Sequence, residues 1–354
     1  MSASGSLPVT VLTGFLGSGK TTLLQKLLDA PGGAGAAVLI NEFGEIGLDH
    51  LLVRTMAGPA VVLQNGCICC TVRSDLRNGL RDLVDARDQG LISPFNRVLV
   101  ETTGLADPVP IVQTLVADPM LRHQMHLANL VSTVDGLNGV AQLDQHREAY
   151  RQVALADRLA LTKSDLCGAA GIAQLRARLE ALNPSAPVIN AADCSDLWNA
   201  LLGSDAFDPA RKSDEVRRWL ARMPDDTPDY SVGDTAALSR HGAAVSSFSV
   251  RTTRGVDWTG FAVWLSALVH RHGNRILRIK GILNVPGSPG PVVLNAVQNF
   301  IHPPTHLKEW PDDDRSSRLV FIVEGLDAGL TRRSLERFLD RAEPDRTDRA
   351  RVTS

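Results

Sequence analysis

A short segment near the start of the chain constrains the fold more than any other feature. Residues Gly14–Thr22 (GFLGSGKTT) match G-x-x-x-x-G-K-[ST], the pattern of a phosphate-binding loop, without a mismatch. The apolar run Val9–Thr13 precedes the loop and Leu23–Leu28 follows it with helical spacing, which is the strand, loop and helix order that the motif requires. The glycines allow backbone N–H groups to point at phosphate oxygens, Lys20 would reach the β- and γ-phosphates, and Thr21 would ligate Mg²⁺. We therefore expect nucleotide contacts from Gly14, Gly17, Ser18, Gly19, Lys20, Thr21 and Thr22.

The composition is that of a soluble globular protein. At 354 residues the chain is long enough for two domains, and its formal net charge of −2 argues against nucleic acid as a partner. No apolar run reaches the length of a membrane span and residues 1–8 lack the regions of a signal peptide, so we expect a cytoplasmic protein without a membrane partner. Three of the five cysteines lie in Cys67–Cys70, a pattern that indicates reduced thiols for metal or redox chemistry rather than disulfides.

Strand and helix patterns alternate through residue 203. This alternation predicts an α/β fold, a P-loop NTPase parallel sheet with helices on both faces. A polar linker follows, and a strand, a helix and then further strands predict a smaller α+β C-terminal domain. The predicted strands are 9–13, 36–40, 60–64, 97–101, 127–134, 158–162, 186–189, 247–251, 275–283, 292–297 and 319–323. We assign 1–203 to the nucleotide-binding domain, 204–244 to the linker, 245–340 to the C-terminal domain and 341–354 to a tail.

An acidic, glycine-containing segment follows the second predicted strand. Residues Asn41–Asp49 (NEFGEIGLD) lie where a nucleotide-sensing switch loop is expected, because ligands meet the carboxyl ends of strands in open α/β sheets. Glu42 and Glu45 are candidate ligands for Mg²⁺, a water or a second metal. A solvated acidic loop would show the same composition.

The fourth predicted strand ends in a carboxylate. The sequence Arg97–Gly104 (RVLVETTG) is typical of a Walker B strand followed by a switch glycine. Glu101 would bind Mg²⁺ directly or through water, and the Gly104 N–H would contact the γ-phosphate. Together with Lys20 and Thr21, Glu101 is a candidate catalytic residue.

Three thiols precede a predicted helix that begins near Ser74. A helix N-terminus stabilises the thiolate, which is the form that binds metal. Cys67, Cys69 and Cys70 therefore predict a soft, partly complete site for Zn²⁺, with Glu42 or Glu45 as a further ligand. Cys67 and Cys70 also form a C-x-x-C pair, which leaves a redox role open, although Cys69 suits coordination better than two-cysteine exchange.

The sixth predicted strand ends in Thr162–Asp165 (TKSD), which resembles the N-K-x-D base-recognition motif of GTPases. The Asp165 carboxylate would accept hydrogen bonds from guanine N1–H and the exocyclic amine, whereas adenine has neither group, so guanine is the expected base. Lys163 would pack along the purine or the phosphate loop, and Thr162 replaces the usual asparagine. Asn190 begins the segment where a second base-contacting loop is expected.

These motifs together resemble the CobW-type metal-chaperone GTPases. The resemblance covers most of the chain and implies a GTP hydrolase that binds zinc, or sometimes cobalt or iron, and delivers it to a client metalloprotein. One departure is the linker, where many family members carry a histidine-rich run and this chain has only His241, which argues against storage of many ions. The matching motifs are GFLGSGKTTLL at Gly14, NEFGEIGLD at Asn41, NGCICC at Asn65, ETTGLADP at Glu101, LTKSD at Leu161, and the C-terminal segments Ile279–Leu283 and Arg318–Ile322.

The residues and the resemblance favour a GTP-hydrolysing metallochaperone whose nucleotide state controls its metal affinity. Three other functions stay open at this stage: a nucleotide-gated scaffold in which hydrolysis hardly matters, a thiol redox protein, and a P-loop kinase, for which no acceptor pocket is indicated. The sequence names neither the client nor the physiological metal, and it leaves oligomerisation open. No residue is identified that would orient the attacking water, so slow intrinsic turnover is expected.

Overall fold

The computed structural model describes residues 6–42, 60–64, 71–203, 216, 220 and 245–341. The chain divides into two compact units, residues 1–222 and 223–354, and each is described by itself. In the part of the chain described here, no helix is both long and apolar enough to cross a membrane.

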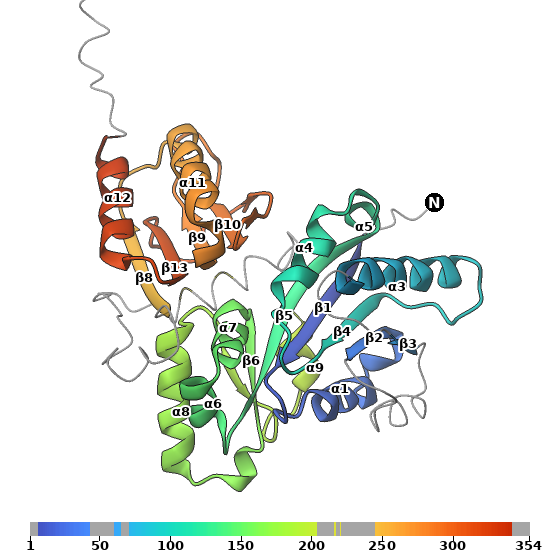
Figure 1. Ribbon diagram of the computed structural model, residues 1–354. Helices are drawn as coiled ribbons and strands as arrows, with labels where there is room; N and C mark the ends of the chain where they lie inside the picture. The colour runs from blue at the N-terminus through green and yellow to red at the C-terminus, as the bar shows by residue number, and fades with distance from the viewer. Residues whose placement is uncertain are drawn as a thin grey trace, which may run out of the picture. The chain divides into compact units, whose positions relative to one another are not determined.

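The first unit is built on a seven-stranded sheet in which every neighbouring pair is parallel. The strand order is β3-β2-β4-β1-β5-β6-β7, so the strand that carries the phosphate loop lies in the middle (Figure 1). The predicted parallel sheet is confirmed, and each predicted strand of this unit is present. Their bounds are β1 Leu7–Gly14, β2 Ala36–Glu42, β3 Ala60–Gln64, β4 Arg97–Thr102, β5 Met125–Asp135, β6 Arg158–Thr162 and β7 Val188–Asn190.

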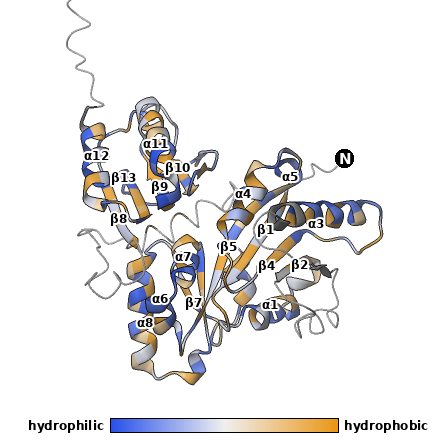
Figure 2. Ribbon diagram, viewed as in Figure 1, coloured by the Kyte–Doolittle hydropathy of each residue, from blue (hydrophilic) through white to orange (hydrophobic). Residues whose placement is uncertain are grey.

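Helices enclose the sheet because its strands are apolar on both faces. Leu23, Leu24 and Leu27 on one helix and Leu201 and Leu202 on another pack against the same side of the strands. Figure 2 shows these strands as apolar and the surrounding helices as striped with polar residues. The helices of this unit are α1 Lys20–Asp29, α3 Thr71–Asp88, α4 Val109–Ala117, α5 Pro119–Gln124, α6 Gly139–Gln145, α7 Arg147–Leu155, α8 Ala169–Leu182 and α9 Leu197–Leu202.

Several short helices are not predicted from the sequence, namely α5, α6, α7 and α9. The helices α5, α6 and α9 have six or seven residues, which is too short to reveal a periodic apolar face. The longer α7 has a polar side with Arg147, Glu148 and Arg151 and a buried side that includes Gln152, but its nine residues make only about two and a half turns, which gives a short periodic pattern.

The register of the central strands brings their functional ends together. Leu12 is paired with Glu101, and Gly14 is paired with Thr133. Asp135 is paired with Thr162 on the next strand. Because these strands are parallel, the phosphate loop after β1, the carboxylate of β4 and the TKSD segment after β6 all leave the sheet at one edge.

The second unit is a smaller α+β module, as predicted. Its six-stranded antiparallel sheet has the order β11-β10-β9-β13-β8, with β12 paired to β10. Residues from two helices and from one face of the sheet form a single apolar core that includes Phe248, Phe261 and Phe321. The elements are β8 Val245–Thr252, α11 Trp258–His272, β9 Ile276–Leu283, β10 Val292–Val297, β11 Phe300–Ile301, β12 Thr305–His306, β13 Ser317–Glu324 and α12 Ala328–Arg341.

Truncating Phe321 tests this core. The ring is fully buried and stacks on Phe248 with centroids 4.9 Å apart, while Trp264 meets it edge-on at 6.2 Å. Phe321→Ala is expected to lower the free energy of unfolding by about 3–5 kcal/mol, because it creates a cavity and removes aromatic contacts. Urea denaturation followed by circular dichroism measures the loss. The control is Val263→Ala on exposed α11 surface, expected to change stability by less than about 0.5 kcal/mol. A loss under about 1 kcal/mol for Phe321→Ala would contradict this account of the core.

Candidate functional site

The glycines of the phosphate loop have conformations that larger residues rarely adopt. Gly14, Gly17 and Gly19 have φ angles of 143°, 69° and 84°. A Cβ atom on Gly14 would also overlap the hydroxyl and carbonyl of Thr133. The loop therefore needs glycine at these positions, so that its backbone N–H groups can line an anion-binding concavity at the N-terminus of α1.

Lys20 and Thr21 begin α1 and face the carboxyl end of the sheet. The buried Lys20 ammonium donates to the carbonyls of Gly14 and Phe15, at 3.0 and 3.2 Å, and so lies against the phosphate loop. The Thr21 hydroxyl donates to Glu101 Oε1 at 2.9 Å. Thr21 and Glu101 offer one uncharged and one charged oxygen, which is the ligand chemistry that Mg²⁺ prefers, while the positive end of α1 favours the phosphates. The residues fit a nucleotide-bound Mg²⁺.

Hydroxyl groups attach the phosphate loop to the two strands beside it. The hydroxyls of Ser18 and Thr133 are 2.6 Å apart, which links the loop to β5. The Thr162 hydroxyl lies 2.7 Å from the Ser18 carbonyl and 3.1 Å from the Val134 carbonyl and donates to both, which links the loop to β6. Thr162 therefore has a structural contact here in place of the amide that the more common asparagine would supply.

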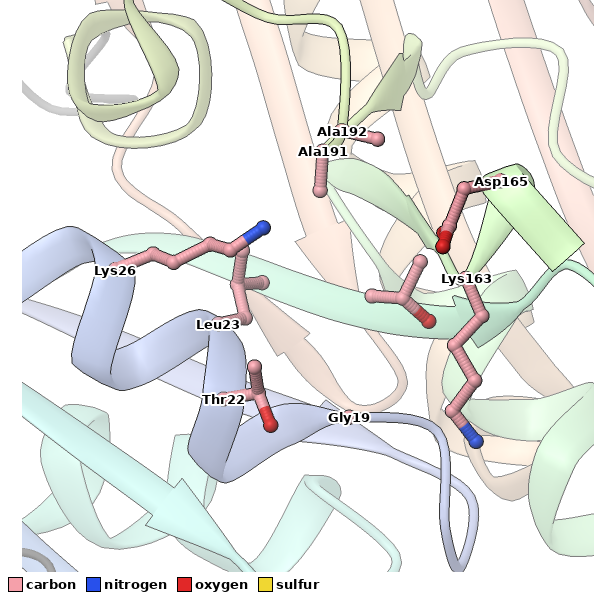
Figure 3. A pocket seen from close by; sticks show the side chains of 9 residues that line it. Gly19, Thr22, Leu23, Lys26, Lys163, Asp165, Ala191 and Ala192 are labelled. Atoms are coloured by element: carbon pink, nitrogen blue, oxygen red, sulfur yellow. The ribbon is translucent and has the colours of Figure 1, made fainter.

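A cavity of about 180 Å³ lies beside the phosphate loop (Figure 3). Asp165 projects into it from the TKSD segment, and Lys26 extends toward it from α1 on the other side. The predicted base-recognition segment and the phosphate loop thus share one site. The lining residues are Gly19, Thr22, Leu23, Lys26, Thr162, Lys163, Asp165, Ala191 and Ala192.

Lys163 is held against the phosphate loop, one of the two positions predicted for it. Its backbone has a left-handed φ of 53°, and its ammonium donates to the Gly17 carbonyl at 2.6 Å and to Asp135 Oδ2 at 2.8 Å. Asp135 is 1% exposed and also accepts hydrogen bonds from the backbone of Leu137 and Asn138, at 2.8 and 3.0 Å. Burial alone would raise the pKa of Asp135, but the hydrogen bonds from Lys163, Asn138 and Leu137 outweigh it and lower that pKa.

Asn190 supports the cavity without lining it. Its Oδ1 accepts a hydrogen bond from the Ser164 hydroxyl at 2.6 Å and another from the Ala192 N–H at 3.3 Å. Its amide donates to Asp193. Asn190 therefore joins the TKSD segment to the loop that carries Ala191 and Ala192.

The segment after β4 lies close to the phosphate loop. A Cβ atom on Gly104 would approach the backbone of Leu16 to 2.7 Å, so only glycine fits there. The amide of the buried Gln152 donates to the carbonyls of Gly104 and Ala106, at 3.1 and 3.0 Å. Arg151 forms an ion pair with Asp107 at 2.9 Å. Helix α7 therefore holds the predicted switch segment in place.

The proposed transition-metal ligands are not brought together among the described residues. Cys67, Cys69, Cys70 and Glu45 lie outside them, and Glu42 is described only through its backbone at the end of β2. In residues 6–42, 60–64, 71–203 and 245–341, no group of three or more histidine, cysteine, aspartate or glutamate side chains could hold a metal ion.

Gln152 is a supporting residue that sequence reasoning did not identify, and for Asp135 it identified a supporting carboxylate at a strand end but no partner. Nothing in the sequence connects Asp135 to Lys163, 28 positions later. Gln152 lies in a helix that is not predicted, 48 positions after Gly104. In both cases the role of the residue depends on a tertiary contact, which a sequence pattern does not reveal.

Replacing Asp135 tests the support of Lys163. Asp135→Asn is expected to lower the free energy of unfolding at pH 7 by about 1–3 kcal/mol, because the buried carboxylate is lost as a partner of Lys163. The folded-state pKa lies below its ordinary value of 3.8, so this stabilisation is present above that value and is lost as the pH falls through the folded-state pKa. Urea denaturation at pH 7 and at steps below pH 3.8 should therefore show the two proteins converging. The control is Asp88→Asn, an exposed ion-pair partner of Arg87, and an equal effect of both variants would contradict the prediction.

Comparison with known proteins places this site in a family. Residues 8–190 match the CobW/HypB/UreG nucleotide-binding domain, and residues 245–339 match the cobalamin synthesis protein CobW C-terminal domain. The chain is 33% identical over 316 residues to the zinc chaperone YjiA of Escherichia coli, which covers 89% of this chain and 93% of that protein. It is 32% identical over 359 residues to the zinc chaperone CobW of Pseudomonas aeruginosa, covering 92% of this chain and 90% of that protein. The crystal structure of the Zn(II)-bound YjiA GTPase from E. coli matches with a TM-score of 0.68 at 26% identity, over 94% of this chain and 99% of that one. The chain therefore belongs to the CobW/HypB/UreG family and has both the nucleotide-binding and the C-terminal domains of its CobW members.

Proposed function

We propose that this protein is a GTP-hydrolysing metallochaperone that binds zinc and delivers it to a client metalloprotein under control of its nucleotide state. The observation that carries the proposal is the cavity in which Asp165 faces the start of α1 beside the phosphate loop. A guanine base and a phosphate chain can occupy this single site together. Relatives named as zinc chaperones and as a zinc-bound GTPase support the metal and the nucleotide.

Hydrolysis depends on groups that contact the phosphates. Lys20 would place its ammonium on the β- and γ-phosphates, and the N–H groups of Gly17, Ser18 and Gly19 would surround the phosphate oxygens. Thr21 and Glu101 would hold Mg²⁺, which when bound with the nucleotide neutralises phosphate charge. The backbone of Gly104 lies close enough to the loop to meet the γ-phosphate, and Gln152 orients this segment through its carbonyls.

Zinc is the cargo, and its proposed ligands are the thiols of Cys67, Cys69 and Cys70 with Glu42 or Glu45. Three thiolates fill three positions of a tetrahedral zinc, and the carboxylate of Glu42 or Glu45 would fill the fourth until the switch loop moves. A donor site needs a position that can open in this way, because a client ligand must enter before the donor thiolates leave. Cobalt or iron would compete for the same thiols, and zinc is favoured by the names of the relatives.

Strand order supports coupling between the nucleotide and the metal. Gln64 ends β3 beside Glu42 at the end of β2, and the cysteine segment follows Gln64 in the sequence. The ends of β3 and β1 are three strand spacings apart, about 14 Å, with β4 and its switch glycine between β2 and β1. Loss of the γ-phosphate would release the segment after β4 and change the ligands beside it. To move zinc from mostly bound to mostly free, the free energy of zinc binding must differ by about 5.5 kcal/mol between the GTP-bound and the GDP-bound protein.

Asp165→Asn tests recognition of the base. The carboxylate accepts from the N1–H and 2-amino donors of guanine, whereas an amide also presents a donor that suits the 2-oxo group of xanthine. The variant is expected to lose at least about 100-fold in kcat/KM for GTP and to gain activity toward XTP. Steady-state phosphate release from GTP, XTP and ATP measures both changes, with the exposed Asp29→Asn on α1 as the control. Unchanged GTP preference in Asp165→Asn would refute guanine recognition by this residue.

Removing the thiols tests the metal site and its coupling. Calorimetry with Zn²⁺ should detect one tight site in the wild-type protein that is lost in the Cys67→Ser/Cys69→Ser/Cys70→Ser variant. A matched variant, Cys167→Ser/Cys194→Ser, removes the two free cysteines of the described residues and should retain the tight site. The affinity of the wild type should differ between GDP and a non-hydrolysable GTP analogue. Equal zinc affinities in the two nucleotide states would contradict the proposed coupling but would not contradict zinc binding by the thiols.

The alternatives give different results in the same assays. A nucleotide-gated scaffold would show no metal-stimulated GTP hydrolysis. A thiol redox protein would cycle Cys67 and Cys70 between thiol and disulfide, and Zn²⁺ would not protect all three thiols from alkylation together.

A further inference from the structure

The cavity beside the phosphate loop has a cationic side that the base-recognition motif does not explain. Lys26 lies on α1, six positions after Lys20, and its side chain lines the cavity. Figure 3 shows it extending over Leu23 toward Ala191 and Ala192, while Asp165 faces the cavity from the TKSD segment. Within the described chain, the Lys26 ammonium makes no hydrogen bond or ion pair. Its three donors are therefore open to a ligand.

The other donors around the cavity are engaged in holding the site together. The Ala191 N–H donates to the Leu161 carbonyl at 2.9 Å, and the Ala192 N–H donates to Asn190 Oδ1 at 3.3 Å. The Lys163 ammonium is shared between a phosphate-loop carbonyl and a buried carboxylate. The Thr162 hydroxyl donates to two carbonyls. Thr22 lines the cavity beside Gly19 of the phosphate loop, across from Asp165.

The two charged groups complement different atoms of a guanine ring. Guanine presents donors at N1 and the 2-amino group, which suit the Asp165 carboxylate, and acceptors at O6 and N7. Adenine carries an amino group at position 6, so it presents a donor where guanine presents an acceptor. An ammonium group has no acceptor and cannot pair with that amine. A cationic donor near O6 therefore favours guanine through attraction and disfavours adenine through an unmatched pair of donors.

We infer that Lys26 is a specificity-determining residue that donates a hydrogen bond to the 6-oxo group of the bound purine. The inference rests on the proposed GTP function and extends it, because it assigns recognition of the 6-oxo group to a side chain of α1. Asp165 then accepts hydrogen bonds from N1–H and the 2-amino group of the base, and Lys26 donates one to the oxygen at position 6. The helix that begins at the phosphates also contributes to the choice of base.

A set of nucleoside diphosphates separates the two contacts. GDP carries both the 6-oxo and the 2-amino group, and IDP keeps only the 6-oxo group. The diphosphate of 2-aminopurine riboside keeps only the 2-amino group, and ADP has neither. All four share the same ribose and diphosphate, so any general effect of Lys26 on phosphate binding is the same for each. Competition calorimetry would give the four dissociation constants for the wild type, Lys26→Met, Lys26→Arg and the control Gln25→Met, an exposed neighbour on α1.

Lys26→Met is expected to raise the dissociation constants of GDP and IDP by about tenfold each. This is the lower end of the range for a hydrogen bond from a charged donor at an accessible site. The variant should leave binding of the 2-aminopurine nucleotide unchanged and should tighten binding of ADP, because the mismatch with its 6-amino group is removed, and Lys26→Arg should restore most of the loss for GDP and IDP because it retains cationic donors. Equal weakening of all four nucleotides, or no weakening of GDP, would overturn the assignment of Lys26. A wild type that binds GDP no more tightly than ADP would instead overturn the proposed guanine preference itself, and that result is visible before any variant is made.

Discussion

The structure of the nucleotide site depends on two hydroxyl contacts to one residue of the phosphate loop. Ser18 meets Thr133 through its side chain and Thr162 through its carbonyl, so the loop is attached to β5 and β6 at once. Asp135 ends β5 and Lys163 directly follows β6, and the Lys163 ammonium contacts the loop at the Gly17 carbonyl. The phosphate loop and the TKSD segment therefore belong to one hydrogen-bonded body, and the positive-φ conformations of the loop glycines are held by neighbours on two sides.

The strand order places the base cavity and the strand ends that lead to the proposed metal ligands on opposite sides of the phosphate loop. Strands β5, β6 and β7 lie on one side of the phosphate loop and supply the base cavity. Strands β4, β2 and β3 lie on the other side and supply Glu101 and the ends of the segments that carry the proposed metal ligands. Helix α7 contributes from outside the sheet, where Gln152 holds the carbonyls of Gly104 and Ala106.

Much of the fold is predictable because its strands are short apolar runs that end in recognisable motifs. The loop Gly14–Thr22, Glu101 and the TKSD segment could be located from the sequence, and the structure brings them to one edge of the sheet. The role of Gln152 and the partner of Asp135 could not be predicted, because the contacts of these residues are with residues 48 and 28 positions away. Thr162 is an intermediate case: the motif places it at the end of β6, but its contact with the Ser18 carbonyl emerges only from the packing of the loop. The proximity of Cys67, Cys69 and Cys70 to the nucleotide stays a prediction, because these residues lie outside those described.

The central position of β1 has a consequence for what such a molecule senses in a cell. The base is recognised on one flank of the phosphate loop, and the strand ends at Glu42 and Gln64 lie on the opposite flank, beyond β4. A signal that travels from the nucleotide to that far flank has to pass through the groups around the terminal phosphate. Under the proposed coupling, metal affinity would follow the ratio of triphosphate to diphosphate, a measure of cellular energy charge, and recognition of the purine would choose which nucleotide pool supplies that ratio.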